Sequence, residues 1–595
     1  MISPDSAPID ASHDTTVAAA GDRTPWSRRL GPALVVAGLT ASAYADSFQG
    51  VFLFDDLEHL RPGAFDRFWP PAVLGSRPLV YLSFYVNYHL GGWNPFGYHA
   101  VNLGVHLTAA LLLLALWTRT LQLPRYRERL ASSTRVLLAL AATLLWAVHP
   151  LNTQAVTYVI QRCESIAGCL CLASLYAWVR GAGSTRPGRW YSVACLSYWL
   201  ACTAKEWAAV WPLMLLSYDF TFLAESPREL LRRRGRWYLV AVLPAAAMTP
   251  YLVWLLFTNE TVGFSMKSVG VVDYAQSQPG VVLHYLRLLA VPDPLCLDYR
   301  WMIARRWPQI VWPAAALTGL AIAGLVALRR RSAFGFLIVG FFVLLAPTSS
   351  FAPIADLAFE HRMYLPSACL SGAALLALGC GLRRLAERRA RPSRYADALT
   401  AGLTLGAIVV FAALTARRNL DYHDDVRMWT TVVRTRPANY RAWGNLGAAL
   451  YHKRRYVEAV AALERALTIH PDYYPSFYAL GECYDLLGRT ADALRMYDRA
   501  LQREPEHAAV HNNLGRLAER DGRPDEAERS YRRATASAPS WTVPRFNLGR
   551  LLAERGRRDE ARTSYEEALR IDPQFGPALR GLERLRDEGM KSSPR

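Results

Sequence analysis

Composition and charge divide this 595-residue chain into unlike halves and exclude several classes of protein. Hydrophobic residues make up 52% of the sequence, the formal net charge is +19, and the mean hydropathy is +0.06. Because an average near zero mixes apolar spans with polar segments, it predicts a membrane part joined to a soluble part. Arginines supply most of the charge and lie between apolar segments, where they set membrane topology, so we expect no nucleic-acid partner. The nine cysteines have neither zinc-site spacing nor a disulfide framework.

Apolar segments long enough to cross a bilayer recur from residue 30 to residue 417. A spanning helix needs about 20 apolar residues, and by this criterion we predict about eleven spans. They cover residues 30–47, 98–117, 136–148, 155–179, 190–203, 208–223, 237–257, 310–328, 334–347, 364–382 and 396–416. The segment 30–417 is therefore predicted to be an all-α polytopic membrane domain. The polar segment 1–29 before it is predicted to be a disordered cytoplasmic N-terminus.

Arginine clusters mark alternate connections between the predicted spans and indicate their orientation. The clusters lie within residues 23–29, 119–135, 180–189, 228–236, 329–331 and 383–394, and the intervening connections are poor in cations. By the positive-inside rule, the Arg-rich connections are cytoplasmic. The apolar stretch 281–291 is too short to span and is predicted to be interfacial or re-entrant. An odd number of spans with a cytoplasmic N-terminus places everything after residue 417 outside.

A repeat of 34 residues occupies the rest of the chain, as the spacing from Pro471 to Pro505 shows. Four units share a Leu-Gly pair, two small residues in the second helix and a closing proline. These are Gly447, Gly481, Gly515 and Gly549; Ala459, Ala493, Ala527 and Ala561; Ala466, Ala500, Ala534 and Ala568; and Pro471, Pro505, Pro539 and Pro573. This is the tetratricopeptide pattern, in which small residues let two helices approach and proline ends the second.

The repeat array is predicted to comprise a linker and half repeat at 418–439, four repeats at 440–575, and a capping helix and tail at 576–595. Such arrays form a superhelix whose concave face binds extended peptides. The alternative is that the array is a rigid spacer or a dimerisation arm. No acid–base constellation in the repeats indicates an enzymatic role for them.

Two adjacent carboxylates, Asp55 and Asp56, lie in the first predicted outside loop. Carboxylates in an apolar frame can act as a general base or ligate a cation. The alternative is a turn or a helix cap, which is how most loop aspartates are used.

Further polar residues lie in or beside the predicted spans, where their cost makes each a functional candidate. His99, Asn102 and His106 share one helix face, at i, i+3 and i+7, and could instead form a packing seam. Arg162 and Glu164 could form a pair that only neutralises itself. The predicted topology brings the remaining candidates to the outer face: Arg77, His149, Lys205, Glu206, Glu360, His361 and Arg362. Cations near a carboxylate suit a lipid phosphate and a nucleophile to be deprotonated.

Six segments carry a resemblance to a known family, in order along the chain. They are FDD at 54–56, SRPLVYLSFYVNYHLGGWNPFGYHAVNLGVH at 76–106, HPLNTQAVTYVIQRCES at 149–165, KE at 205–206, LCLDYRW at 295–301 and FEHRMYLP at 359–366. With the repeats behind them, the chain resembles the transmembrane and tetratricopeptide-repeat family of protein O-mannosyltransferase-like proteins, within the GT-C glycosyltransferase superfamily. The arginine-rich composition and the segments QRCES at 161–165 and FEHRMYLP at 359–366 indicate a bacterial inner-membrane member, with the repeats outside the cytoplasm.

The resemblance implies a glycosyltransferase and assigns roles to the candidate residues. It implies a first-loop base, Asp55 or Asp56, with motif position favouring Asp56. The implied donor is a polyprenyl-phosphate sugar, mannose by family analogy, whose phosphate Arg77, Arg162, Lys205 and Arg362 would stabilise. The implied acceptors are Ser/Thr hydroxyls of secreted or membrane proteins, which the repeats recruit. Supporting roles fall to Glu164, Glu206, His149, Glu360, His361, His99, Asn102 and His106.

The resemblance implies no certain cofactor, and a divalent metal stays possible because metal use varies in the superfamily. Relatives often carry ionisable residues where this chain has Asn152 and Gln154, which weakens any metal or acid role on that turn. Two other functions compete with glycosyl transfer: a non-catalytic membrane scaffold whose repeats assemble envelope proteins, and a transporter. A transporter would be supported by an inverted repeat between the halves, and the sequence has none that we detect.

Overall fold

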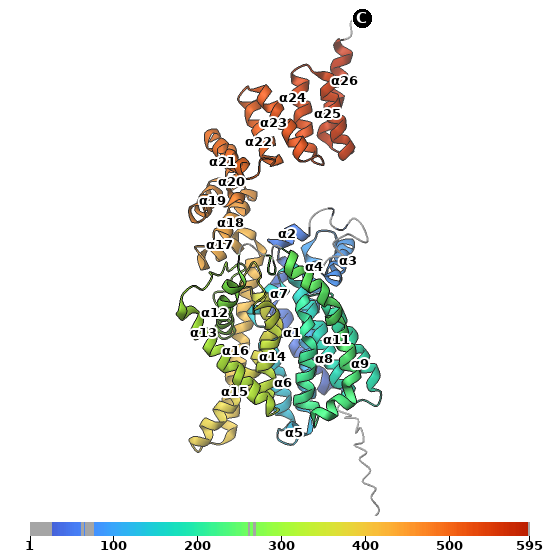
Figure 1. The fold of residues 1–595 in the computed structure, drawn as a ribbon, viewed down its shortest axis with the longest axis vertical. Helices are drawn as coiled ribbons and strands as arrows, with labels where there is room; N and C mark the ends of the chain where they lie inside the picture. The colour runs from blue at the N-terminus through green and yellow to red at the C-terminus, as the bar shows by residue number, and fades with distance from the viewer. Residues whose placement is uncertain are drawn as a thin grey trace, which may run out of the picture.

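The computed structural model describes residues 26–60, 63, 65, 77–259, 262–265 and 269–592. Within these residues the chain is all-α, and one isolated bridge pairs Val262 with Ile354. The first 25 residues of the segment predicted to be disordered lie outside the described part. Its last residues belong to α1 (Trp26–Ala43), so the first helix begins earlier than residue 30. Figure 1 shows a helical membrane body with the repeats rising from one end.

The described part of the chain has a helix at each of the eleven predicted spans. Besides α1 these are α4 (Pro95–Leu121), α6 (Ser132–Ala147), α8 (Arg162–Ala182), α9 (Pro187–Cys202), α10 (Trp211–Tyr218), α11 (Pro227–Thr258), α13 (Trp307–Arg329), α14 (Ala333–Leu345), α15 (Tyr364–Arg388) and α16 (Ser393–Asn419). Of the described helices, six are long and apolar enough to cross a membrane, or seven if the bent pair Ser132–Ala147 and Pro150–Val156 is one span. The others are shorter, so the number of eleven stays a prediction.

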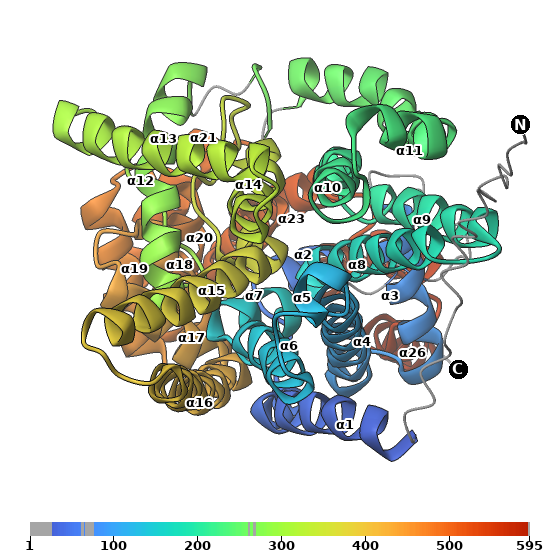
Figure 2. The same cartoon turned by 90° about the horizontal axis from the view of Figure 1, so that it is seen from below.

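Leucines and other apolar side chains on the outer faces of these helices explain why they need a bilayer. The spanning windows of α11, α13 and α16 are only 6%, 11% and 17% buried inside the protein, whereas that of α8 is 61% buried. Apolar surface of this extent is stable only against lipid. Seen along the bundle in Figure 2, α11, α13 and α16 lie at the periphery and α8 lies near the centre.

Helix α12 (Val271–Ala290) contains most of the stretch predicted to be interfacial and begins well before it. The Tyr274 hydroxyl donates to the Thr348 carbonyl at 2.6 Å, and the Tyr285 hydroxyl donates to the Phe359 carbonyl at 2.8 Å. Both bonds tie α12 to the segment between α14 and α15. Helix α12 therefore lies with the loops at the repeat-bearing end of the bundle.

Short helices fill the connections at that end. They are α2 (Asp55–His59), α3 (Pro78–Gly91), η3 (Pro150–Asn152), α7 (Thr153–Val156), η4 (Val159–Gln161), η5 (Glu206–Val210) and η8 (Glu360–Met363). Figure 1 shows α2 and α3 near the repeats, whereas α5 (Pro124–Arg127), from an Arg-rich connection, lies at the opposite end of the body. The candidate polar residues and the arginine clusters are thus at opposite ends of the membrane body.

The repeats are paired antiparallel helices, as predicted. Their bounds are α18 (Tyr440–His452) with α19 (Tyr456–Ile469), α20 (Tyr474–Leu486) with α21 (Thr490–Arg503), α22 (Ala508–Arg520) with α23 (Pro524–Ser537), and α24 (Thr542–Glu554) with α25 (Arg558–Ile571). A Cβ added at Gly515 would lie 2.5 Å from the Tyr531 ring, so only glycine permits this approach of the helices. Each closing proline lies two residues after its helix ends. The cap is α26 (Gly576–Ser592).

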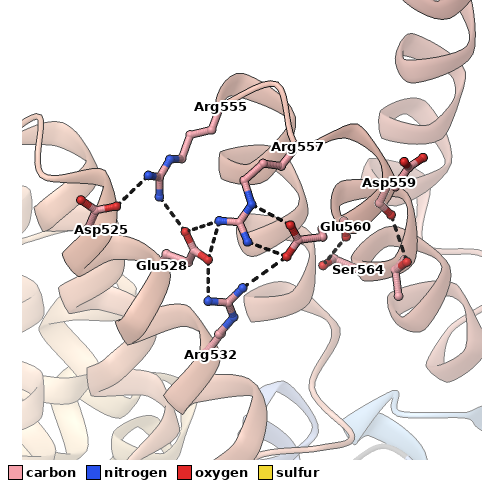
Figure 3. Close-up of polar contacts among 9 residues, drawn as sticks. Asp525, Glu528, Arg532, Arg555, Arg557, Asp559, Glu560 and Ser564 are labelled. Carbon is pink, nitrogen blue, oxygen red and sulfur yellow. Dashed lines mark hydrogen bonds and ion pairs between the residues drawn. The ribbon is translucent and has the colours of Figure 1, made fainter.

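Charged side chains join the last two repeats at the level of Glu528 (Figure 3). The buried Glu528 carboxylate accepts hydrogen bonds from Arg555 at 2.6 Å and from Arg557 at 2.8 Å, and Arg532 lies 2.5 Å away. Arg557 also pairs with Glu560. Because these residues come from successive repeats, the network stabilises their stacking beyond the apolar contacts.

The half repeat at 418–439 contains η9 (Leu420–His423) and α17 (Asp425–Thr435), and these fix the array to the body. The Arg441 guanidinium donates to Asp298 at 2.6 and 2.8 Å and to Asp356 at 2.5 Å, which links the first repeat to two body loops. The backbone N–H of Val51 donates to the Tyr422 carbonyl at 3.0 Å. The array is therefore anchored beside the first loop of the body.

Candidate functional site

The first loop of the body forms a short helix whose aspartates have different environments. Phe54 precedes α2 with a φ of 48°, which is rare for a residue with a side chain. Its ring packs edge-on against Trp429 of α17, with centroids 5.3 Å apart. The half repeat therefore contacts the residue next to the paired carboxylates, Asp55 and Asp56.

Asp56 is 1% exposed and its carboxylate is occupied by backbone donors. One oxygen accepts the N–H of Leu53 at 3.1 Å, and the other accepts the N–H of Ile160 at 2.7 Å. Burial raises the pKa of Asp56 to about 8, although these backbone bonds lower it. A carboxylate held in this way anchors the loop to η4. The predicted preference for Asp56 as the base stays a prediction, for a residue whose two oxygens both accept backbone N–H groups.

Asp55 is half-buried, and in the described part of the chain its carboxylate does not accept backbone N–H groups as that of Asp56 does. Its backbone N–H donates to the Tyr158 hydroxyl at 2.9 Å. Burial raises the pKa of Asp55, while the Tyr158 hydroxyl and the nearby His59 lower it. A carboxylate with a raised pKa and an open side is suited to accept a proton. Asp55 is thus the more exposed of the two predicted candidates.

Two cations and two carboxylates meet around Cys163, where the start of α3, α8 and η5 come together. Arg77 donates to Glu206 at 3.2 and 3.5 Å, and Lys205 lies 3.3 Å from Glu164. The side chains of Arg77 and Lys205 are 32% and 11% exposed, so both cations can reach a bound group. Although burial raises the pKa of Glu206, the charges of Arg77 and Lys205 lower it overall. Glu206 therefore stays ionised and holds Arg77 in place.

Arg162 forms no ion pair with Glu164 among the described residues, and its predicted role as a phosphate ligand stays a prediction. It is 0% exposed, and its guanidinium donates to the Asn102 side chain, the Ser83 hydroxyl and the Tyr98 carbonyl. It also lies over the Phe84 ring, 4.5 Å from the centroid. With its nitrogens directed to protein acceptors, Arg162 ties α3 and α4 to α8. It acts as a structural support of the site.

Arg362 is buried at the edge of the cation group. Its guanidinium donates to the carbonyls of Leu357 at 2.9 Å, Thr348 at 3.2 Å and Asp356 at 2.6 Å. These bonds shape the segment between α14 and α15, and they leave Arg362 lining a small pocket together with Glu164. Arg362 can therefore add positive potential to the site, with less freedom to move than Arg77.

The next two predicted supporting residues, Glu360 and His361, are held by neighbouring loops. The Glu360 carboxylate accepts the Tyr299 hydroxyl at 2.6 Å and the backbone N–H of Cys296 at 2.5 Å. Burial raises the pKa of Glu360 and lowers that of His361, whose ring stacks on Phe359. A neutral His361 adds no charge to the cation group. Both residues position η8.

Four further predicted residues form hydrogen bonds between elements. His99 bonds the Gly50 carbonyl at 3.1 Å, and Asn102 donates to the Val156 carbonyl at 3.0 Å. His106 bonds the Tyr364 hydroxyl and the Ala147 carbonyl, both at 2.9 Å, and His149 bonds the Leu289 carbonyl at 3.0 Å. Burial lowers the pKa of His149 to about 4, so this imidazole is neutral at pH 7. These contacts are those of a polar packing seam.

An apolar cavity lies inside the membrane body, next to the small pocket that Glu164 and Arg362 line. Residues of α4, α8, α10, α14 and α15 line it, and along α14 the lining runs from Ala333 to Leu344. That run is about 16 Å long at 1.5 Å per residue. The small pocket of Glu164, Trp207 and Arg362 shares two lining residues with the cavity, Leu344 and Leu365. The apolar cavity and the small charged pocket are thus neighbours, with Leu344 and Leu365 between them.

Sequence reasoning missed three residues of this site. The Cys163 thiol accepts contacts from Lys205 at 3.6 Å and from Arg77 at 4.0 Å, although the apolar helix around it suggests a simple packing role. Trp207 donates to Glu164 at 2.6 Å. Tyr158 bonds the backbone of Asp55. All three lie within two residues of predicted site residues or in the motif at 149–165, which is the signal that could have found them.

The sequence does not decide whether the protein binds a metal ion. Among the described residues, no group of three or more His, Cys, Asp or Glu side chains is arranged to hold a metal ion. With Asp56 committed to backbone N–H groups, the paired aspartates offer one free carboxylate. We therefore derive no step through a metal.

Comparisons with known proteins connect this geometry to a family. Tetratricopeptide-repeat models match residues 440–503, 478–540 and 545–575. Protein O-mannosyl-transferase Tmtc3 of Drosophila melanogaster is 26% identical over 531 residues, covering 75% of this chain and 56% of that protein. Protein O-mannosyl-transferase TMTC3 of Homo sapiens is 22% identical over 520 residues, covering 77% and 53%. This chain is a homologue of the protein O-mannosyl-transferases. It spans about half the length of these relatives.

The repeats also match solved structures. The crystal structure of MamA covers 27% of this chain, with 91% of its own length aligned, at 20% identity and a TM-score of 0.24. The matches to O-mannosyl-transferases extend over both the membrane body and the repeats, since each covers about three quarters of this chain. The homologues and the family models support a membrane body joined to a tetratricopeptide-repeat region.

Proposed function

We propose that this protein transfers a sugar, mannose by analogy with its relatives, from a polyprenyl-phosphate donor to Ser or Thr hydroxyls of proteins. The observation that carries this proposal is that the apolar cavity lies next to the charged pocket, with which it shares Leu344 and Leu365. A donor of this kind has a long apolar tail and an anionic head. An apolar cavity beside a pocket that Arg362 lines suits both parts.

In the proposed reaction, Asp55 takes the proton of the acceptor hydroxyl. The acceptor oxygen attacks the anomeric carbon of the sugar, the bond from that carbon to the phosphate oxygen breaks, and the lipid phosphate leaves. Arg77 and Lys205 would stabilise the negative charge that grows on the phosphate, and Arg362 would add to the local potential. Because base and leaving group act from opposite sides of the sugar, inversion at the anomeric carbon is expected.

The proposed site lies outside the cytoplasm, in a bacterial inner membrane. Support comes from the arginine clusters: α5 and the connection around Arg329 lie in Arg-rich segments, and α5 is at the end of the body opposite the repeats (Figure 1). Cations favour the cytoplasmic side. On this basis the repeats, Asp55 and the cation group share the outer side.

The repeats are proposed to recruit acceptor proteins. Support comes from the anchoring of the array next to the first loop, through Trp429 against Phe54 and through Arg441 with Asp298. Tetratricopeptide arrays bind extended peptide segments along their concave faces. An array fixed at this place would hold a bound chain near Asp55.

The test is sugar transfer by the purified full-length protein in lipid, with labelled polyprenyl-phosphate mannose and a secreted Ser/Thr-rich acceptor. We expect Asp55→Asn to lower the transfer rate by about 10²- to 10⁴-fold, the usual contribution of a general base. Glu58→Gln is the matched control, because Glu58 is an exposed carboxylate one turn along α2. Labelling by wild type no higher than without protein would favour a scaffold without catalysis, and equal labelling above that level by wild type and Asp55→Asn would show that Asp55 is not the base.

A further inference from the structure

A polar groove lies where the membrane body joins the repeats. The last turn of α16, η9, α17 and the loop before Cys296 enclose a cavity of about 490 Å³. Its polar lining includes Arg417, Arg418, Asp421, Arg427, Thr431 and Arg434. None of these residues belongs to the proposed transfer site. The groove therefore requires its own explanation.

The charges that line this groove are not balanced. Four arginines and two aspartates line it. Asp421 serves two of the arginines, at 3.0 Å from Arg418 and 3.1 Å from Arg427. In the described part of the chain, Arg417 and Arg434 have no ion pair. Four guanidinium groups that converge on one hollow with two carboxylates leave room for an anion.

Arg418 adds a second, independent indication of a ligand. It is only 6% exposed, and one of its nitrogens donates to Asp421. The Nε and Nη2 atoms are buried and have no hydrogen-bond partner among the described residues. A buried guanidinium with unsatisfied donors is costly, and an anion in the groove that it lines would provide acceptors.

The position of the groove indicates that the anion belongs to a lipid. Leu403, Val410 and Arg417 are seven residues apart and thus lie on one face of α16. Leu403 and Val410 are 50% and 53% exposed, as expected of side chains that face lipid. Arg417 ends this face, and Leu414 lines the groove beside it. The groove thus opens where the hydrocarbon surface of α16 gives way to the headgroup level.

We propose that this groove binds the phosphate of an anionic lipid headgroup. Arg417 and Arg434 would supply the uncompensated charge, and the buried Nε and Nη2 groups of Arg418 would supply hydrogen-bond donors. A helix C-terminus favours cations, which accounts for Arg417 and Arg418 in the last turn of α16 and for Arg434 in that of α17. That effect does not account for the convergence of all three, with Arg427, on one cavity.

The experiment measures lipid binding by native mass spectrometry of the full-length protein in detergent. Wild type is titrated with phosphatidylglycerol, with phosphatidylcholine and with soluble glycerol phosphate. We expect phosphatidylglycerol to bind more tightly than phosphatidylcholine, and R417Q/R434Q to weaken it roughly thirtyfold, since each arginine near an anionic lipid contributes about a factor of five. The charge-preserving R417K/R434K variant is expected to bind like wild type.

The matched control is R584Q/R586Q, which removes two exposed arginines of the capping helix and should bind lipid like wild type. Glycerol phosphate distinguishes two sources of the anion. If it binds as tightly as the lipid, the groove is a phosphate site for a soluble molecule and the lipid assignment is wrong. Equal phosphatidylglycerol binding by wild type and R417Q/R434Q, or no preference over phosphatidylcholine, would overturn the site itself.

Discussion

Single residues of the first loop show how burial separates two neighbours of the same chemistry. The carboxylate of Asp56 is enclosed and accepts two backbone N–H groups, whereas Asp55 keeps an open side. The same helical turn therefore presents one structural anchor and one proton acceptor. Replacing Asp56 should therefore affect mainly the stability of the protein, and replacing Asp55 should affect mainly the rate of transfer.

Asp56→Asn is expected to destabilise the protein. A carboxamide has one acceptor oxygen, so the N–H of Leu53 or of Ile160 loses its partner, at a cost of about 1–3 kcal/mol. Thermal unfolding should show this loss for Asp56→Asn and a smaller change for Asp55→Asn. If Asp56→Asn unfolds like wild type and only abolishes transfer, our assignment of the anchor is wrong.

The pH dependence of transfer should report Asp55. A base acts in its deprotonated form, and burial raises the pKa of Asp55 above its ordinary value of about 4. The rate is therefore expected to rise with pH through this raised pKa and to fall at lower pH, where the carboxylate becomes protonated. The midpoint of the acid limb of kcat/KM should lie above pH 4. An acid limb at or below the ordinary aspartate pKa would speak against Asp55.

Lys205 and Glu164 provide a test of the cation group. Lys205→Ala leaves the Glu164 carboxylate, 3% exposed, without its cation, and such a loss costs about 3–5 kcal/mol. The double variant Lys205→Ala with Glu164→Gln removes the uncompensated charge and should recover much of the stability in thermal unfolding. Transfer should stay low in both, because the cation near the donor phosphate is missing. Recovery of activity in the double variant would show that Lys205 acts only through Glu164.

At the scale of helices, the repeats could be predicted in detail. A period of 34 residues fixes which positions face the partner helix, so Gly515 and Ala527 lie at the packed faces as expected. In the body, helices occur at each predicted span, because apolar length is a local property. Helices α1 and α12 both begin earlier than predicted, because the ends of a helix depend on its capping residues and on its neighbours.

The candidate site could be predicted only in part. Topology alone brings Arg77, Lys205 and Arg362 to one end of the bundle. Which cations stay available depends on long-range pairing, and no local pattern reveals that Arg162 bonds Asn102, sixty residues away. The same holds for Asp56, whose oxygens accept N–H groups from two separate loops. The sequence therefore indicates which residues lie near the site, and the long-range hydrogen bonds decide which of them support the fold.

Close packing within a repeat gives a prediction at this scale. Gly515→Ala would place a methyl group 2.5 Å from the Tyr531 ring, so the helices of this repeat must separate. We expect a loss of about 1–3 kcal/mol and earlier cleavage of the array in limited proteolysis. Gly406→Ala is the control, because no atom lies within 4 Å of the added carbon there. Equal cleavage of both variants would contradict this packing argument.

The whole molecule is a membrane body whose polar end carries the repeats (Figure 1). Contacts from Phe54 to Trp429 and from Asp298 to Arg441 join the two parts beside the proposed site. The arginine-lined groove lies at the same junction. If it holds a lipid headgroup, the bilayer itself would steady the repeats relative to Asp55.

The most direct test of this account uses sealed vesicles that contain the protein in a known orientation and labelled polyprenyl-phosphate mannose. The acceptor protein is supplied only on the side where protease can reach the repeats. We predict that wild type labels the acceptor there and that Asp55→Asn does not. Labelling that survives in Asp55→Asn, or that occurs only when the acceptor is on the opposite side, would contradict the account.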